Sequence, residues 1–188
     1  MKNKKLVLIG SSTGGPGHLD KILSSLDRHL NATIIIAQHL DFSFLPSMVK
    51  RFDDICKQPV IQAHENESID QNSVVFAYRN ISNLQFSPTK GLYLRKCTQS
   101  AFYQPSVNSL FLSASKLHAH YDILVCLLTG IGDDGAEGML ALKNGGARCI
   151  SESEDSCIVY GMPKAAFELG ASTEVMSLDN IIKTIKNF

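Results

Sequence analysis

The chain has 188 residues, of which 44% are hydrophobic and 19% are charged. This composition is typical of a folded globular protein and excludes a largely disordered chain. The 18 basic and 18 acidic residues give a formal net charge of zero, which argues against a nucleic-acid partner bound through bulk charge.

Cysteine usage and hydropathy indicate the compartment. The five cysteines include no Cys-x-x-Cys pair, which suits free thiols in a reducing cytosol. No apolar run approaches the roughly 20 residues needed to cross a bilayer, and the apolar segment 6–9 is too short for a signal peptide. We therefore expect a cytoplasmic protein that is not inserted in a membrane, with one domain over residues 1–188.

Short apolar runs alternate along the chain with segments of helical periodicity. The expected strands are 6–9, 33–37, 60–61, 74–77, 123–128 and 147–150, with a hairpin formed by 84–87 and 92–94. Expected helices carry their apolar faces at 19–26, 45–52, 107–117 (capped by Ser106) and 139–142, and two more follow Pro163 and Asp179, the last capped by Asp179. This alternation predicts a doubly wound α/β fold, with a mostly parallel sheet, helices on both faces and an antiparallel hairpin.

Ligands of such sheets bind beyond the carboxyl ends of the strands, so the residues that follow each strand are the first candidates for a site. The first strand is followed by Gly10-Ser-Ser-Thr-Gly14, which fits the G-x-S-x-G turn that exposes a serine before a helix. Ser12 is the candidate nucleophile there. The same glycines, continuing to Gly17, are equally compatible with a phosphate-binding loop or a simple helix cap.

Two further strand ends carry residues that could complete the chemistry. His39 follows the second strand and could accept the serine proton, although alone it fits a hydrogen-bonded structural histidine as well. Asp133 and Asp134 follow the 123–128 strand, where one could orient the imidazole and either could cap the next helix. Ser, His and Asp thus follow three candidate parallel strands, in an order that differs from that of α/β-hydrolases.

Other site types fit the sequence poorly. Pro16-Gly17 stands where a Walker loop needs Gly-Lys-Ser/Thr, and Gln38-His39 stands where a dinucleotide site needs an acid. His118 and His120 have no cysteine partners nearby, which argues against a metal site. We expect no cofactor and no metal.

The chain resembles the catalytic domain of the CheB family, the protein-glutamate methylesterases of bacterial chemotaxis. The resemblance covers essentially the whole chain in order. It is carried by residues 9–16 (IGSSTGGP), 38–39 (QH), 104–111 (QPSVNSLF), 128–139 (LTGIGDDGAEGM) and 160–166 (YGMPKAA).

By position, the resemblance implies that Ser12 is the nucleophile, His39 the general base and Asp134 the residue that orients it. It implies a supporting hydroxyl at Thr13. It also implies an oxyanion-facing backbone N–H at Ile131, where the family usually has Met. The implied activity is hydrolysis of glutamate γ-methyl esters, and in some members glutamine deamidation, on the cytoplasmic helical domain of methyl-accepting chemoreceptors.

Some features depart from the family pattern. The catalytic motif begins at residue 10, so we expect no receiver domain and therefore no control by its phosphorylation. Asn108 replaces the usual Asp, and the P-G-x-x-H pattern after Ala77 is missing. The segment 40–45, directly after His39, lacks the usual proline. The alternative to an enzyme is a non-catalytic module that binds receptors, or phosphate on the Gly10–Gly17 loop.

Overall fold

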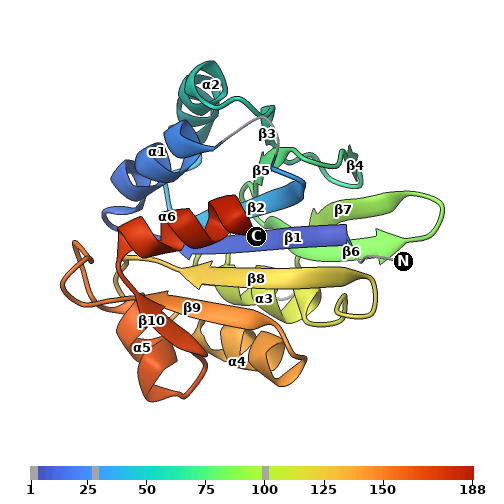
Figure 1. Cartoon of the computed structure of the whole chain (residues 1–188). Coiled ribbons are helices and arrows are strands. Elements are labelled where there is room, and N and C mark those ends of the chain that lie inside the picture. The colour runs from blue at the N-terminus through green and yellow to red at the C-terminus, as the bar shows by residue number, and fades with distance from the viewer. Residues whose placement is uncertain (1–3, 27–29, 99–101) are drawn as a thin grey trace.

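Seven strands form the central sheet of the computed structural model, which describes residues 4–26, 30–98 and 102–188. These strands are β1 (Lys4–Ser11), β2 (Ala32–Gln38), β3 (Val60–Gln62), β5 (Val74–Phe76), β8 (Tyr121–Leu127), β9 (Arg148–Glu152) and β10 (Glu174–Met176). Their order is β10-β9-β8-β1-β2-β5-β3, and every pairing is parallel (Figure 1). The predicted parallel sheet is confirmed.

A second, antiparallel sheet in the order β4-β7-β6 lies beside the first. It consists of β4 (Ser68–Ile69), β6 (Ile81–Ser87) and β7 (Gly91–Lys96). β6 and β7 form the predicted hairpin. β4 and β10 are not among the strands expected from the sequence. They are only 2 and 3 residues long, too short to show a hydropathy period of their own.

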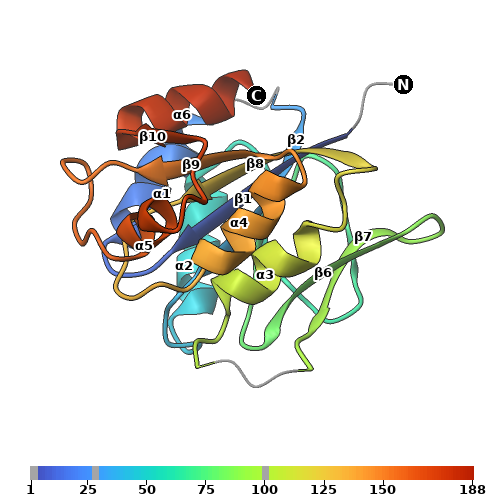
Figure 2. The ribbon, with the colours of Figure 1, turned by 90° about the horizontal axis from the view of Figure 1, so that it is seen from below.

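In the described part of the chain, six helices cover the two faces of the parallel sheet. They are α1 (Gly15–Ser25), α2 (Leu45–Ile55), α3 (Val107–Ala114), α4 (Ala136–Asn144), α5 (Met162–Glu168) and α6 (Leu178–Asn187). α1, α2 and α6 pack on one face, whereas α3, α4, α5 and the small sheet pack on the other (Figure 2). The chain is therefore doubly wound, as predicted.

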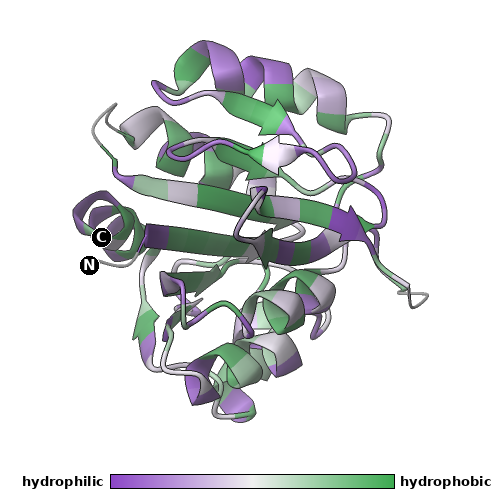
Figure 3. Cartoon of the chain, turned by 90° about the vertical axis from the view of Figure 1, so that its right-hand side faces the viewer, coloured by the Kyte–Doolittle hydropathy of each residue, from purple (hydrophilic) through white to green (hydrophobic). Residues whose placement is uncertain are grey.

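Both faces of the central strands are buried, which explains why the strands are apolar throughout rather than alternating. On β1, Leu6 and Leu8 belong to the core beneath α3 and α4, whereas Val7 and Ile9 belong to the core beneath α1 and α6. Figure 3 shows the central strands coloured as hydrophobic along most of their length.

Helix capping follows the sequence in one case and departs from it in another. Ser106 caps α3 as predicted, because its Oγ accepts a hydrogen bond from the backbone N–H of Ser109. The prediction that Asp179 caps the last helix is wrong. Ser177 is the N-cap of α6, and Asp179 lies in the first turn, where a negative charge still interacts favourably with the helix dipole.

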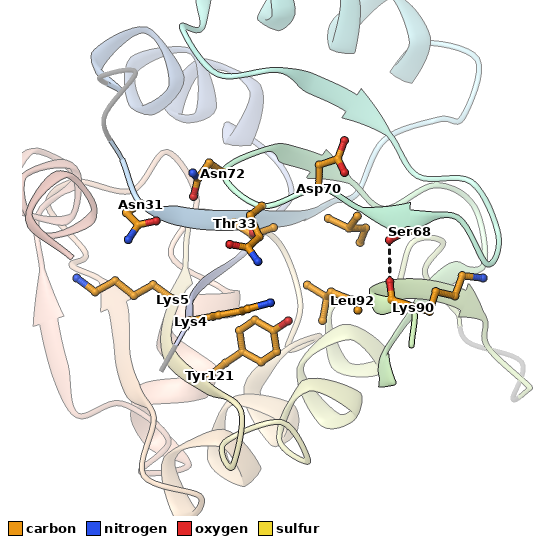
Figure 4. Close-up of a pocket in the computed structure, with 13 residues that line it drawn as sticks. Lys4, Lys5, Asn31, Thr33, Ser68, Asp70, Asn72, Lys90, Leu92 and Tyr121 are labelled. Carbon is orange, nitrogen blue, oxygen red and sulfur yellow. Dashed lines mark hydrogen bonds between the residues drawn. The ribbon is translucent and has the colours of Figure 1, made fainter. Parts of the chain in front are cut away.

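A hollow of about 340 Å³ opens at the amino ends of β1, β2 and β8 (Figure 4). Its lining includes Lys4, Thr33, Lys90 and Tyr121. None of the predicted catalytic residues lines it, because they follow the opposite, carboxyl ends of the same strands. This hollow is therefore not the site of the predicted chemistry.

Helix α3 packs so closely on β1 that residue 10 has no room for a side chain. A Cβ on Gly10 would lie 2.4 Å from Val107 Cγ1 and 2.9 Å from Leu127 Cδ1. We expect Gly10→Ala to lower the free energy of unfolding by about 2 kcal/mol, measured by urea denaturation. Gly17→Ala is the matched control, because a Cβ there meets nothing within 4 Å. Equal stability of the two variants would contradict this account.

Candidate active site

The three loops that carry the predicted residues meet at the carboxyl edge of the sheet because their strands are direct neighbours. β1 lies between β8 and β2. Ser11 is paired with Gln38 across β1 and β2, and Gly10 with Leu127 across β1 and β8, so the three strands end at the same level. The sheet register therefore brings Ser12, His39 and the 129–135 loop to one place.

Ser12 occupies the turn between β1 and α1 and is held through its backbone. Its N–H donates to Thr129 O at 3.0 Å. Its carbonyl accepts hydrogen bonds from the N–H of Gly15 at 2.8 Å and from Gln38 Nε2 at 2.9 Å. Gly14 makes the turn possible, because its φ of 85° lies in the left-handed region that favours glycine. The Ser12 side chain is left half-buried at the surface of the sheet edge.

His39 and Asp134 form a buried pair. His39 Nε2 lies 2.7 Å from Asp134 Oδ2, and the two side chains are 8% and 7% exposed. The ring of Tyr103 stacks on the imidazole with centroids 4.2 Å apart and planes 9° apart. His39 Nδ1 is buried and has no hydrogen-bond partner among the described residues. This nitrogen is therefore the one left to exchange a proton with a substrate or a nucleophile.

The described residues include no hydrogen bond between Ser12 Oγ and His39. The two residues are nevertheless joined through the ends of their strands, since His39 N–H donates to Ser11 O at 2.9 Å. Catalytic hydrogen bonds are often long or poorly aligned in a free enzyme and tighten when substrate binds. The structure thus pairs His39 with Asp134 as predicted. It brings Ser12 to the same edge of the sheet, but without a hydrogen bond from Ser12 Oγ to His39.

Asp134 is charged although it is buried. Its Oδ2 also accepts from Val107 N–H at 2.8 Å, and its Oδ1 accepts from Asn108 N–H at 2.9 Å. Burial is the largest single effect and raises the pKa of this carboxyl. The hydrogen bonds from His39, Asn108 and Val107 outweigh it and hold the pKa below its usual value. A carboxylate in this position holds the imidazole of His39 in its orientation.

Asn108 is a residue that the sequence analysis noted only as a departure from the family. Its Oδ1 accepts the N–H groups of Gly135 at 3.0 Å and Gly138 at 2.9 Å, and so caps α4. The alternative that Asp133 or Asp134 caps this helix is wrong, because the N-cap residue is Gly135 and has no side-chain bond. An amide oxygen accepts these bonds as a carboxylate would, so Asn in place of Asp keeps the cap.

The loop after β8 brings a free donor next to Ser12. A Cβ on Gly130 would lie 2.7 Å from Ser12 Cβ, so only glycine allows this approach. The N–H of Ile131, the next residue, makes no hydrogen bond within the described part of the chain. The Ile131 side chain is 58% exposed. Thr13 is exposed beside the nucleophile, and its carbonyl accepts a hydrogen bond from Thr129 Oγ1 at 2.9 Å.

The described residues contain no group of three or more His, Cys, Asp or Glu side chains placed to hold a metal ion. No helix among them is long and apolar enough to cross a membrane.

The hydrogen bonds to Asp134 predict how stability depends on pH. Because the pKa of Asp134 is lower in the folded state, its contribution is present above the unfolded pKa of about 3.9 and is lost as the pH falls through the folded value. We expect Asp134→Asn to lower the free energy of unfolding by about 2 kcal/mol at pH 7. This deficit should shrink steadily between about pH 5 and pH 2, measured by urea denaturation across that range. The exposed neighbour Asp133, changed to Asn, is the control, and a deficit independent of pH would contradict the assignment.

The chain is similar in sequence and in fold to known proteins. The CheB methylesterase family model matches residues 7–185. The protein-glutamate methylesterase/protein-glutamine glutaminase of Halalkalibacterium halodurans is 36% identical over 97% of this chain and 53% of its own length. The protein of the same name from Shewanella frigidimarina is 38% identical over 98% of this chain and 46% of its own length.

The crystal structure of the Thermotoga maritima CheB methylesterase catalytic domain matches with a TM-score of 0.89 and 29% identity, and the match covers 99% of both chains. The chain spans about half the length of the curated relatives it matches. The expectation that it is a single catalytic domain without a receiver domain stays a prediction. The resemblance found in the sequence is confirmed, and the chain belongs to the CheB methylesterase family.

Proposed function

We propose that this protein hydrolyses glutamate γ-methyl esters on methyl-accepting chemoreceptors, using Ser12, His39 and Asp134, and releases methanol. The observation that carries the proposal is the buried His39–Asp134 pair, with its 2.7 Å hydrogen bond and an unpartnered His39 nitrogen at the sheet edge that carries Ser12. The names of the relatives, protein-glutamate methylesterase/protein-glutamine glutaminase, support the same chemistry.

In the first half of the proposed reaction, Ser12 Oγ attacks the ester carbonyl while His39 Nδ1 takes the hydroxyl proton. Asp134 stabilises the imidazolium that forms. The negative charge on the carbonyl oxygen is stabilised by the backbone N–H of Ile131, with Thr13 as a supporting hydroxyl. When the tetrahedral intermediate collapses, His39 returns the proton to the departing methoxy oxygen and methanol leaves.

In the second half, water attacks the acyl-Ser12 ester and gives a proton to His39. His39 then passes this proton to Ser12 Oγ as the bond to the acyl carbon breaks, which restores the hydroxyl. The product is the free glutamate side chain. A glutamine side chain can follow the same path with ammonia as the leaving group, which is the glutaminase activity in the relatives' name. No step requires a metal or a cofactor.

The substrate is a side chain on a cytoplasmic helical domain, so we propose that the protein acts in the cytoplasm. Cysteine chemistry agrees with this setting. Cys126 and Cys149 are buried free thiols within β8 and β9, and burial raises the pKa of both, which makes them poor nucleophiles.

The alternative of a phosphate-binding Gly10–Gly17 loop has less support. A phosphate cradle needs several free N–H groups at the start of the helix. Here the N–H of Gly15 donates to Ser12 O, Pro16 has none, and the N–H of His18 donates to Gly14 O. These bonds and the proline leave the start of the helix with fewer free donors than its glycines suggest.

Methanol release from methyl-esterified chemoreceptor membranes tests the proposal. We expect Ser12→Ala to lower the rate by about a thousandfold or more, since it removes the nucleophile, and His39→Gln to do the same. Ser24→Ala, an exposed serine on α1, is the matched control and should leave the rate unchanged. Methanol release that persists in Ser12→Ala, or no release by the wild type from any methylated receptor, would overturn the proposal.

A further inference from the structure

A second buried His–carboxylate pair lies behind the nucleophile turn. His18 stands in the first turn of α1, and Glu152 is the last residue of β9. His18 Nε2 lies 2.8 Å from Glu152 Oε1, and the two side chains are 6% and 0% exposed. The proposed reaction uses neither residue. A buried ion pair must be compensated by good geometry and further hydrogen bonds, so its partners indicate what it holds in place.

The carboxylate of Glu152 is fully engaged. Its Oε1 also accepts from Ser156 Oγ at 2.7 Å, and its Oε2 accepts from the N–H of Thr129 at 2.8 Å. Burial raises the pKa of Glu152, but the bonds from His18, Ser156 and Thr129 together bring it below its usual value. The bond to Glu152 in turn raises the pKa of His18. Both changes favour the charged pair.

The Glu152–Thr129 bond connects this pair to the nucleophile. Thr129 O accepts the N–H of Ser12 at 3.0 Å, and Thr129 Oγ1 donates to Thr13 O at 2.9 Å. On the other side, His18 belongs to the helix whose first residue, Gly15, donates its N–H to Ser12 O. The contacts form a closed ring from Ser12 through α1, His18, Glu152 and Thr129 back to Ser12.

We propose that His18 and Glu152 are positioning residues for Ser12, acting through Thr129, and that their opposite charges must be kept or removed together. The proposal rests on the proposed function for its catalytic consequence. The turn that carries Ser12 contains Gly14 in a left-handed conformation, and a shift of about 1 Å in a nucleophile can cost a hundredfold in rate. The ring of contacts restrains that shift.

The charge requirement separates this role from simple space filling. His18→Ala leaves the Glu152 carboxylate buried without its counter-charge, which weakens its hold on Thr129. Adding Glu152→Gln to His18→Ala removes the orphaned charge, while the Gln carbonyl oxygen can still accept the N–H of Thr129. If His18 served only to fill space, this second change would not repair the first.

Amide hydrogen exchange tests the ring without depending on activity. We expect His18→Ala to speed exchange at the N–H groups of Ser12 and Thr129 by about tenfold or more, while Ile35, deep in β2, stays protected. The His18→Ala/Glu152→Gln double variant should return within about threefold of the wild type. The control is Glu174→Gln, which breaks the exposed Arg148–Glu174 pair beside the same strand. Unchanged exchange at the two amides, an equal rise at Ile35, or no recovery in the double variant would overturn the proposal.

Methanol release by the same variants tests the catalytic consequence. We expect kcat to fall about tenfold in His18→Ala with KM within about twofold, and to recover in the double variant, because a displaced nucleophile slows the chemistry rather than binding. A changed KM with unchanged kcat, or no recovery, would contradict a positioning role. If even the wild type released no methanol, the proposed function would fail, and the exchange experiment would still decide whether the ring exists.

Discussion

The charge of the buried Asp134 carboxylate is the constraint around which the site is arranged. A carboxylate at this depth needs donors on every lone pair, and it obtains them from His39, from Ser106 and from the first N–H groups of α3. The amino end of α3 must therefore face the carboxyl edge of the sheet. That placement presses α3 onto β1 at Gly10 and lets Asn108 of α3 cap α4 in return. The same contacts of Asp134 and α3 therefore orient His39 and fix how α3 packs on α4.

Two buried carboxylates, at or just beyond the ends of neighbouring strands, hold the two sides of the site. Asp134 follows β8 and binds His39, the proposed base, whereas Glu152 ends β9 and contacts, through Thr129, the turn that carries Ser12. Each accepts one bond from a histidine, one from a serine hydroxyl and at least one from a backbone N–H. Charge-assisted bonds of this kind are shorter and more directional than neutral ones, so two loops that contain several glycines gain a defined geometry. Turns whose glycines permit many backbone conformations are thereby held in one of them.

The fold and the three catalytic candidates could be predicted because both depend on local patterns. Uniformly apolar strands indicate a parallel sheet, and the ends of neighbouring parallel strands meet wherever the register is level. The partners of buried polar groups could not be predicted in this way. His18 and Glu152 are 134 positions apart, and Asn108 caps a helix that begins 28 residues later. The sequence does hold a signal for Glu152, since this acid lies two residues beyond the end of the expected strand 147–150.

The place of Ile131 shows which parts of this site the chemistry constrains. The group proposed to meet the oxyanion is a backbone N–H, and its approach depends on Gly130, where a Cβ would lie 2.7 Å from Ser12 Cβ and 2.4 Å from the sulfur of Met162. The constraint therefore lies on the backbone and on the glycine. The side chain of Ile131 is mostly exposed. Exchange of Met for Ile at this position therefore leaves the donor in place. It alters only the exposed apolar surface at the edge of the proposed site.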